Sequence, residues 1–417
     1  MLTLYKFLTQ AAYTLSFPWL KNKYAIGFDE RRGVYAKEKR LNNAIWVHAV
    51  SVGEVQAALP FISLAKSDPY AQVNVLLSTT TITGAKVAKQ WSGRYDAHIY
   101  FPWDIERFIT RALDSLKPRA FISVETEIWP LMLNVLKQRG IPSFLINGRI
   151  SDKSFKRMSS IPSFWRDVFS CFENIMVRDE QDAYRLNKLG VSLGKISVTG
   201  DCKIDAMLER KDKCGALQEI NHSKPIFIAG STHPGEEEIV FEAFKILREK
   251  ISGVKLIIVP RHPERAAEVG ALASQIGKAV YYSEFDNNEF ISGASDWEIL
   301  TVDKIGALFC LYSIARSAFI GGSLVPKGGQ NIMEPALFGI PLCHGRYMSD
   351  FSHVSDQFVT LGISKIVETA EEIADFWLLS MDENYKNKTK FLSENWFSDH
   401  GGAAAKNWDI VKNSNFA

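Results

Sequence analysis

The sequence predicts an α/β protein of two Rossmann-like domains, each with a parallel sheet covered by helices. Short apolar runs typical of buried strands alternate with helical segments from Asn43 onward. The chain has 417 residues, which exceeds the usual size of a single hydrophobic core. The alternation stops near residue 220 and restarts after the polar stretch 221–225, which has the composition of a linker.

The composition is that of a globular protein, with 46% hydrophobic and 23% charged residues. A net charge of +2 argues against a nucleic-acid partner bound through bulk charge. The odd number of cysteines and the lack of a C-x-x-C motif favour a reducing compartment and small buried thiols over a disulfide framework. Their spacing predicts no metal site. The five are Cys171, Cys202, Cys214, Cys310 and Cys343.

Residues 1–40 form a separate N-terminal segment. Residues 1–20 are apolar but contain Lys6, Gln10 and Pro18, which makes them marginal for spanning a bilayer. They lack the features of a cleaved signal peptide. An apolar helix followed by basic residues suits the surface of an anionic membrane, although such a helix could instead pack on the first domain. The basic residues are Lys21, Lys23, Arg31, Arg32, Lys37, Lys39 and Arg40.

The first Rossmann-like domain is expected at residues 41–220. Its predicted strands end in polar residues, and ligands of parallel α/β sheets bind beyond the carboxyl ends of the strands. These polar residues are Ser51, Glu54, Glu125, Glu127 and Arg149.

Glu54 is the sharpest candidate for catalysis. Gly53 would permit an unusual backbone angle that places Glu54 at a helix start, where a carboxylate could take a proton from an acceptor hydroxyl. The alternative is that Glu54 only complements the dipole of its own helix. Glu125 and Glu127 alternate along a strand, so one of them is expected to face the crevice.

The second Rossmann-like domain is expected at residues 221–395. Arg261 follows a strand and could meet a phosphate. Asp303 is expected to cap a helix with Gly306 in its first turn, where a phosphate could approach. Between residues 318 and 341, a glycine-rich turn is expected to offer N–H groups to an anion, with Asn331 as N-cap and Glu334 accepting hydrogen bonds from a ribose.

Neither a P-loop nor a G-x-G-x-x-G motif after the first strand is present, which disfavours ATPase and NAD-dependent functions. Acid groups in the first domain and an anion site in the second favour a glycosyltransferase, with donor and acceptor in the cleft that the two domains face.

Five motifs occur together and in order. The chain thereby resembles, over nearly its whole length, the bacterial 3-deoxy-D-manno-octulosonic acid (Kdo) transferase family of lipopolysaccharide inner-core biosynthesis. The motifs are His48–Glu54, Glu125–Pro130, Thr199–Asp205, Val259–Arg265, and Gly321–Ser323 with Asn331–Glu334.

The resemblance implies a GT-B fold, CMP-Kdo as donor, a lipid A precursor (lipid IVA) as acceptor, and no cofactor. It also implies a location on the cytoplasmic face of the inner membrane, and a helix at residues 396–417 that packs back on the first domain. Glu54 is implied as the base, with Glu125 or Glu127, and Lys203, supporting the transition state. The residues implied to hold CMP are Pro260, Arg261, Ile305, Gly306, Ala307, Asn331, Ile332, Met333 and Glu334.

Related sequences can carry Gly-Glu where this chain has Gly306-Ala307, so the resemblance supports a backbone contact there and not a side-chain contact. A base on one side and a leaving group on the other predict an inverting, metal-independent displacement in which Arg261 stabilises the leaving phosphate. Two alternatives stay open. The first is another nucleotide-sugar enzyme, a UDP-sugar 2-epimerase or a UDP-dependent glycosyltransferase. The second is a catalytically inactive nucleotide-sugar-binding membrane protein.

Overall fold

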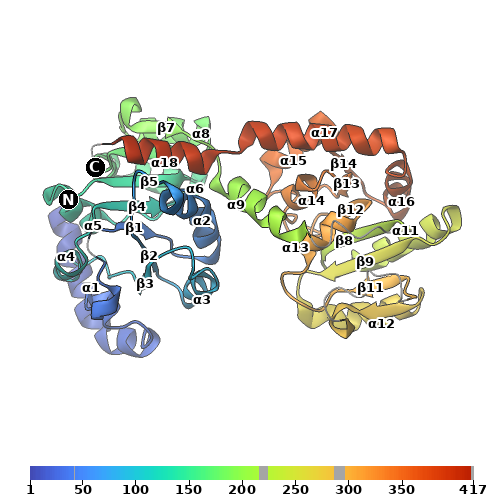
Figure 1. Cartoon of the computed structure of the whole chain (residues 1–417), viewed down its shortest axis with the longest axis horizontal. Coiled ribbons are helices and arrows are strands. Elements are labelled where there is room, and N and C mark those ends of the chain that lie inside the picture. Colours follow the sequence, from blue (N-terminus) through green and yellow to red (C-terminus); the bar gives the residue numbers. More distant parts are fainter. Residues whose placement is uncertain (42, 216–223, 286–295, 415–417) are drawn as a thin grey trace. The chain divides into compact units, whose positions relative to one another are not determined.

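The computed structural model describes residues 1–41, 43–215, 224–285 and 296–414, and it divides into two compact units (Figure 1). The first unit comprises Met1–Ala206 with His400–Ala417, and the second comprises Met207–Asp399. Each unit contains one seven-stranded parallel sheet. The predicted α/β fold class with two Rossmann-like sheets is confirmed. Of the predicted linker, residues 221–225, the first three lie outside the described residues.

The sheet of the first unit has the strand order β3-β2-β1-β4-β5-β6-β7. From β1 the chain adds strands first on one side of the sheet and then, from β4, on the other, and β1 pairs in parallel with both β2 and β4. Such a change of direction opens a crevice at the carboxyl ends of the strands. The strands are β1 (Ile45–His48), β2 (Val75–Thr79), β3 (Ala97–Tyr100), β4 (Ala120–Val124), β5 (Ser143–Gly148), β6 (Asn174–Val177) and β7 (Ile196–Val198).

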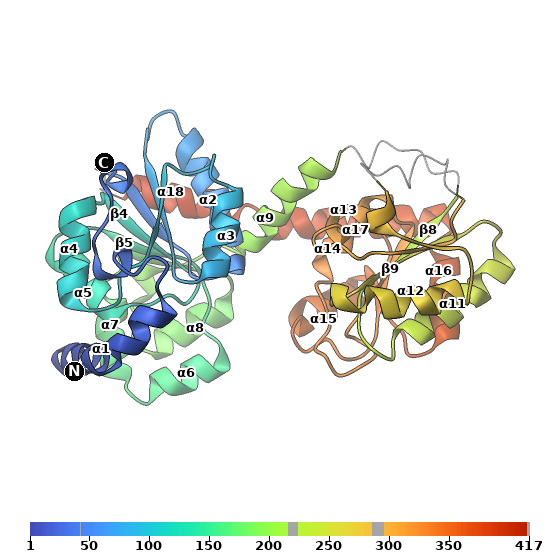
Figure 2. The same ribbon diagram turned by 90° about the horizontal axis from the view of Figure 1, so that it is seen from below.

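Helices cover both faces of this sheet because alternate strand residues point to opposite sides. Val47 packs with the core beneath α2 and α18, whereas Trp46 packs with the core beneath α4 and α5. Figure 2 shows α7 and α1 beside α5. The helices of this unit are α1 (Leu2–Lys23), α2 (Val52–Ser67), α3 (Ile82–Gln90), α4 (Glu106–Leu116), α5 (Pro130–Gln138), α6 (Asp152–Ser159), α7 (Pro162–Phe169), α8 (Glu180–Lys188), α9 (Cys202–Lys211, which continues into the second unit) and α18 (Ala403–Asn413).

The carboxylate of Asp205 fixes the start of α18. It accepts hydrogen bonds from the N–H groups of Gly402 at 2.6 Å and Ala404 at 2.8 Å, which lack partners within the helix. Trp408 of α18 is buried, and its indole N–H donates to Asp68 at 2.9 Å. Helix α18 therefore packs in the core of the first unit. Residues 396–400, the start of the predicted helix at 396–417, instead end the preceding helix α17 (Glu383–His400).

The sheet of the second unit has the order β10-β11-β9-β8-β12-β13-β14. Its strands are β8 (Ile226–Thr232), β9 (Lys255–Pro260), β10 (Ala279–Tyr281), β11 (Ile299–Thr301), β12 (Ser317–Ile320), β13 (Leu342–His344) and β14 (Ser364–Ile366). Its helices are α11 (Glu237–Lys250), α12 (Ala266–Ser274), α13 (Leu308–Leu311), α14 (Met333–Leu337), α15 (Ser352–Leu361), α16 (Ala370–Leu379) and α17 (Glu383–His400).

The N-terminal helix α1 packs on the first unit by one face and leaves the opposite face exposed. Tyr13 is buried against Phe108 and Trp103, and the Tyr5 hydroxyl donates to Asp104 at 3.0 Å. No helix among the described residues is long and apolar enough to cross a bilayer. The exposed apolar side chains of α1, each 56–85% accessible, are Leu4, Phe7, Leu8, Leu15 and Trp19.

The basic residues after α1 do not form one solvent-facing cluster, which corrects the sequence-based expectation. Arg31 is buried and donates to the carbonyl oxygen of Thr80 at 2.7 Å. Lys39 pairs with Glu30 at 2.6 Å. These internal bonds use part of the positive charge to attach the segment to the first unit.

Three further expectations are wrong in detail. Asp303 does not cap a helix, because its carboxylate accepts hydrogen bonds from Ser283 and α13 begins only at Leu308. Gly306 consequently precedes that helix. The N-cap of α14 is Ile332, while Asn331, one residue earlier, accepts a hydrogen bond from the N–H of Met333 at 3.1 Å.

The cysteines also differ from expectation. Cys214 and Cys310 form a disulfide within the second unit, across 96 residues of sequence. Cys202 and Cys343 are buried free thiols, as predicted, and Cys171 is a half-buried free thiol. The sequence spacing gave no sign of the pair because its members meet only through the tertiary fold.

Candidate active site

Glu54 lies in the first turn of α2, directly after the carboxyl end of β1. The residue is 9% exposed, and local bonds hold its carboxylate: Ser51 Oγ donates to Oε1 at 2.7 Å, and the N–H of Val50 donates to Oε2 at 2.7 Å. These bonds fix Glu54 in the first turn of α2, where its charge also complements the helix dipole, as the alternative interpretation of the sequence expected. Each carboxylate oxygen has two lone pairs, so both can still accept a bond from a ligand.

Gly53 does not have the unusual backbone angle that the sequence suggested. Its φ is not positive, and a Cβ at this position would meet nothing within 4 Å. The missing side chain instead leaves the space beside Glu54 open.

Glu125 and Glu127 both interact electrostatically with Glu54. Strand β4 ends at Val124, and Glu125 has a left-handed backbone with φ of 59°, so the strand alternation no longer applies. Lys203 Nζ lies 2.6 Å from Glu125 Oε1. The Ser123 hydroxyl donates to the carbonyl oxygen of Glu127 and thereby fixes the turn.

These side chains form one electrostatic cluster, which we call the acid cluster: Glu54, Glu125, Glu127 and Lys203. Burial, and then the charges of Glu54 and Glu125, raise the pKa of Glu127 to about 8. Burial also raises the pKa of Glu54, against the lowering effect of its two hydrogen bonds, and Lys203 lowers it further. At neutral pH, Glu127 therefore carries a proton, and burial makes Glu54 a stronger base than an exposed glutamate.

Sequence reasoning missed two buried residues at strand ends, Asn147 and His48, and Asn147 supports this cluster. Asn147, at the end of β5, accepts a hydrogen bond from the N–H of Cys202 at 2.8 Å and so fixes the start of α9, which carries Lys203. His48 at the end of β1 stacks on Phe101 at 3.7 Å, and burial lowers the pKa of its imidazole to about 3. Their positions at strand ends were visible in the sequence, but their partners were not.

In the second unit, the N–H groups of Gly322, Ser323 and Leu324 at the start of the glycine-rich turn after β12 are not free for a ligand, because a buried carboxylate already binds them. Oε2 of Glu236 accepts from the N–H groups of His233 at 2.9 Å and Gly322 at 2.7 Å. Oε1 accepts from Ser323 and Leu324, each at 2.9 Å. The expected anion of this turn is thus the protein's own Glu236, which sequence reasoning missed.

The residues expected to hold CMP follow strands β9, β11 and β12 of one sheet. Arg261, after Pro260 at the end of β9, has an exposed side chain. Ile305 is 89% exposed, and Gly306 has a φ of 91°. Ala307 is the N-cap residue of α13.

The segment Asn331–Glu334 forms the start of α14. Ile332 is fully buried, so only its backbone could contact a ligand, whereas Met333 is half-buried. The Asn331 amide donates to Glu334 Oε1 at 3.3 Å. Burial raises the pKa of Glu334, while Arg210 and Asn331 lower it.

No group of three His, Cys, Asp or Glu side chains in the described part of the chain could hold a metal ion. His233 and His262 lie near each other, with ring centroids 6.0 Å apart. Burial, followed by the neighbouring charges of His262 and Lys327, lowers the pKa of His233.

Comparisons with known proteins agree with this arrangement. Residues 27–206 match the family model described as 3-deoxy-D-manno-octulosonic-acid transferase (kdotransferase). The 3-deoxy-D-manno-octulosonic acid transferase of Haemophilus influenzae is 31% identical over 358 residues, which cover 84% of this chain and 82% of that protein. The chain belongs to the Kdo transferase family.

This chain is also similar to other proteins in sequence and in fold. A bifunctional glycosyltransferase/methyltransferase of Fusobacterium nucleatum is 31% identical over 99% of this chain, but the chain spans only 63% of that protein. Among solved structures, the UDP-GlcNAc 2-epimerase of Neisseria meningitidis aligns with a TM-score of 0.61 over 89% of this chain and 100% of its own, at 14% identity. That likeness shows the GT-B fold alone.

Proposed function

We propose that this chain transfers Kdo from CMP-Kdo to a lipid A precursor, with Glu54 as general base. The observation that carries this proposal is the acid cluster, in which a basic carboxylate lies at a strand end beside a protonated Glu127 and the cation Lys203. A general base works best when its pKa lies near the working pH and it can reach the proton it removes.

The reaction would be a single displacement at the anomeric carbon of Kdo. As the bond to the CMP phosphate breaks, an acceptor hydroxyl oxygen forms the new glycosidic bond, and its proton passes to Glu54. Attack opposite to the leaving group would invert the configuration. Because Glu127 keeps its proton, it adds no second negative charge beside the carboxylate of Glu54.

The second unit would bind the donor nucleotide. The exposed guanidinium of Arg261 suits the phosphate, since arginine offers paired N–H donors to phosphate oxygens. Glu334 would accept hydrogen bonds from the ribose hydroxyls, with its position set by Asn331. The backbone of Gly306, Ala307 and Ile332 would complete the site.

Purified protein incubated with CMP-Kdo and a tetraacylated lipid A precursor tests this function, with the products read by mass spectrometry. The proposal predicts a product heavier by one or more Kdo residues, with inverted anomeric configuration by NMR. Stabilisation against heat by CMP but not by UMP would separate it from a UDP-sugar enzyme. No product under conditions in which CMP binds would refute the acceptor or donor assignment.

We also propose that α1 lies on the cytoplasmic face of the inner membrane. Its exposed apolar side chains, Leu4, Phe7, Leu8, Leu15 and Trp19, share one side of the helix, and Lys21 and Lys23 follow in its last turn. Such a helix inserts its apolar face among acyl chains and its cations among anionic headgroups.

Flotation with vesicles that contain anionic phospholipid tests this membrane contact. The double variant Leu8→Glu/Leu15→Glu should lose at least about 10-fold in vesicle affinity, because each buried leucine contributes about 1.5–3 kcal/mol. The control Thr9→Glu/Gln10→Glu adds the same charge at more polar positions of α1. Equal loss in both variants would attribute the effect to charge and contradict apolar insertion.

A further inference from the structure

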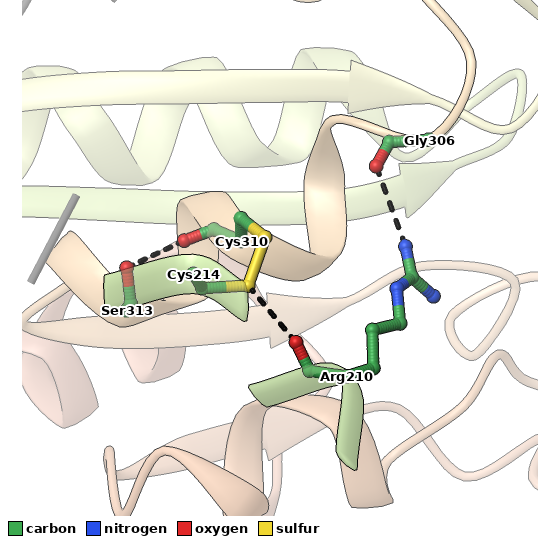
Figure 3. Close-up of a disulfide and its surroundings, with 5 residues drawn as sticks. All are labelled: Arg210, Cys214, Gly306, Cys310 and Ser313. Carbon is green, nitrogen blue, oxygen red and sulfur yellow. Dashed lines mark hydrogen bonds between the residues drawn. A yellow bond between two sulfur atoms is a disulfide. The ribbon is translucent and has the colours of Figure 1, made fainter. Parts of the chain in front are cut away.

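The disulfide between Cys214 and Cys310 joins two segments beside the expected nucleotide site of the second unit (Figure 3). Cys214 ends the short 3-10 turn Asp212–Cys214 that follows α9, and Cys310 lies within α13. Their Cα atoms are 5.3 Å apart, and Cys214 is only 2% exposed. The bond therefore ties the end of α9 to the helix that directly follows Gly306 and Ala307.

Arg210 lies one helical turn before Cys214 and contacts the same segment. Its Nη2 donates to the carbonyl oxygen of Gly306 at 3.4 Å, and its guanidinium lies 4.0 Å from the ring centroid of Phe309 (Figure 3 shows the first contact). Its charge also acts on Glu334 and stabilises the ionised carboxylate. Arg210 thus links the two parts of the expected nucleotide site.

Lys211 adds a third attachment. Its ammonium donates to the carbonyl oxygen of Leu337 in α14 at 2.8 Å and lies 5.7 Å from the ring of Phe338. The hydrogen bond of Lys211 has a normal length, whereas that of Arg210 is long and weak. Without the disulfide, the contact of Arg210 with Gly306 would therefore be held only loosely. The disulfide is the covalent element of this attachment.

Reduction would break this covalent attachment without disrupting the end of α9. The Sγ atom of Cys214 lies 3.6 Å from the carbonyl oxygen of Arg210, but a disulfide sulfur carries no proton and cannot donate to it. A reduced thiol at the same place could donate to that oxygen. The thiol state would therefore keep the local turn and lose only the covalent connection to α13.

We propose that the Cys214–Cys310 pair makes nucleotide binding depend on the thiol–disulfide state, with Arg210 as the positioning residue that transmits the change to Gly306 and Glu334. This inference rests on the proposed function, which places CMP in the second unit. The oxidised chain holds Arg210 against its partners and binds nucleotide tightly. The reduced chain holds Arg210 loosely and binds it more weakly.

The chemical step is thiol–disulfide exchange with a small thiol or a protein dithiol as reductant. A thiolate attacks one sulfur and forms a mixed disulfide, and the other cysteine leaves as a thiolate. A second thiol of the reductant then resolves the mixed disulfide. The reductant ends as a disulfide, and two electrons and two protons end on Cys214 and Cys310.

The test is calorimetric titration of the full chain with CMP, after oxidation with oxidised glutathione and again after reduction with dithiothreitol. Mass spectrometry of alkylated peptides reports the state of the pair. We expect reduction to raise the Kd for CMP about 5- to 10-fold. It should raise KM for CMP-Kdo while leaving kcat at saturating donor nearly unchanged, a split that loss of folded protein would not produce.

Variants separate the disulfide from other thiols. Cys214→Ser/Cys310→Ser should bind CMP like the reduced wild type and not respond to dithiothreitol, whereas the control Cys171→Ser should respond like the wild type. Arg210→Ala should weaken binding in both states and reduce the response, and Arg210→Lys should recover part of the affinity.

Two results would overturn the inference: equal CMP affinity in both states, or no Cys214–Cys310 bond after oxidation. Equal affinity would leave the proposed function intact. Absence of CMP binding in either state of a folded chain would instead remove the proposed function.

Discussion

Glu236→Gln tests the finding that a buried carboxylate organises the turn after β12. The carboxylate accepts four backbone N–H groups, two on each oxygen. A glutamine amide keeps one oxygen for two of these donors and turns an NH₂ group toward the other two. Because a hydrogen bond to a charged group contributes about 1.5–3 kcal/mol, losing two should destabilise the second unit by about 3–6 kcal/mol.

Hydrogen exchange with mass spectrometry measures this effect where it should occur. In Glu236→Gln, the amides of peptides covering residues 318–330 should exchange at least about 100-fold faster than in the wild type, because a free energy of 1.4 kcal/mol corresponds to a factor of ten. Glu238→Gln makes the same chemical change at an exposed position of α11 and should leave these amides unchanged. Unchanged protection in Glu236→Gln would refute the role assigned to this carboxylate.

Two further predictions concern single positions. Glu127 has a pKa near 8 in the folded chain against 4.5 unperturbed, so the folded state binds the proton more tightly and the wild type loses stability as the pH rises from 4.5 to 8. The free energy of unfolding of Glu127→Gln, measured relative to that of the wild type, should therefore rise by about 1–3 kcal/mol from pH 4.5 to pH 8. If urea unfolding gives the same difference at every pH, the raised pKa of Glu127 is contradicted. Gly321→Ala should cost at least about 2 kcal/mol, because its Cβ would lie 2.3 Å from the carbonyl oxygen of Ser231. Gly53→Ala, with nothing within 4 Å of its Cβ, should be neutral or stabilising by up to about 1 kcal/mol; equal unfolding midpoints for the two variants would refute the steric reasoning.

Much of the fold follows from local pattern. Ile45–His48 and Ala120–Val124 are short, mostly apolar runs, which favour strands buried on both faces, and the alternation with helices indicates parallel pairing. The parallel sheets in turn place Glu54 and Glu125 at the same edge. These steps need only periodicity and the geometry of a parallel sheet.

The remaining features depend on tertiary contacts that no local pattern encodes. Glu127 joins the acid cluster because Glu125 leaves the strand with a positive φ. Glu236 binds amides 86 to 88 residues away in sequence. Asp303 turns to Ser283 and not to the following helix, since the two side chains meet across neighbouring loops.

The base assignment is the central claim, and the transfer rate of Glu54→Gln tests it most directly. Glu180→Gln, an exposed glutamate in the first turn of α8, is the matched control. With CMP-Kdo and the lipid A precursor, Glu54→Gln should lose at least about 100-fold in kcat while its Kd for CMP stays within about 2-fold of the wild type, and the control should retain full activity. Turnover of Glu54→Gln at the wild-type rate would show that Glu54 has only a structural role at the start of α2 and that the base is another group.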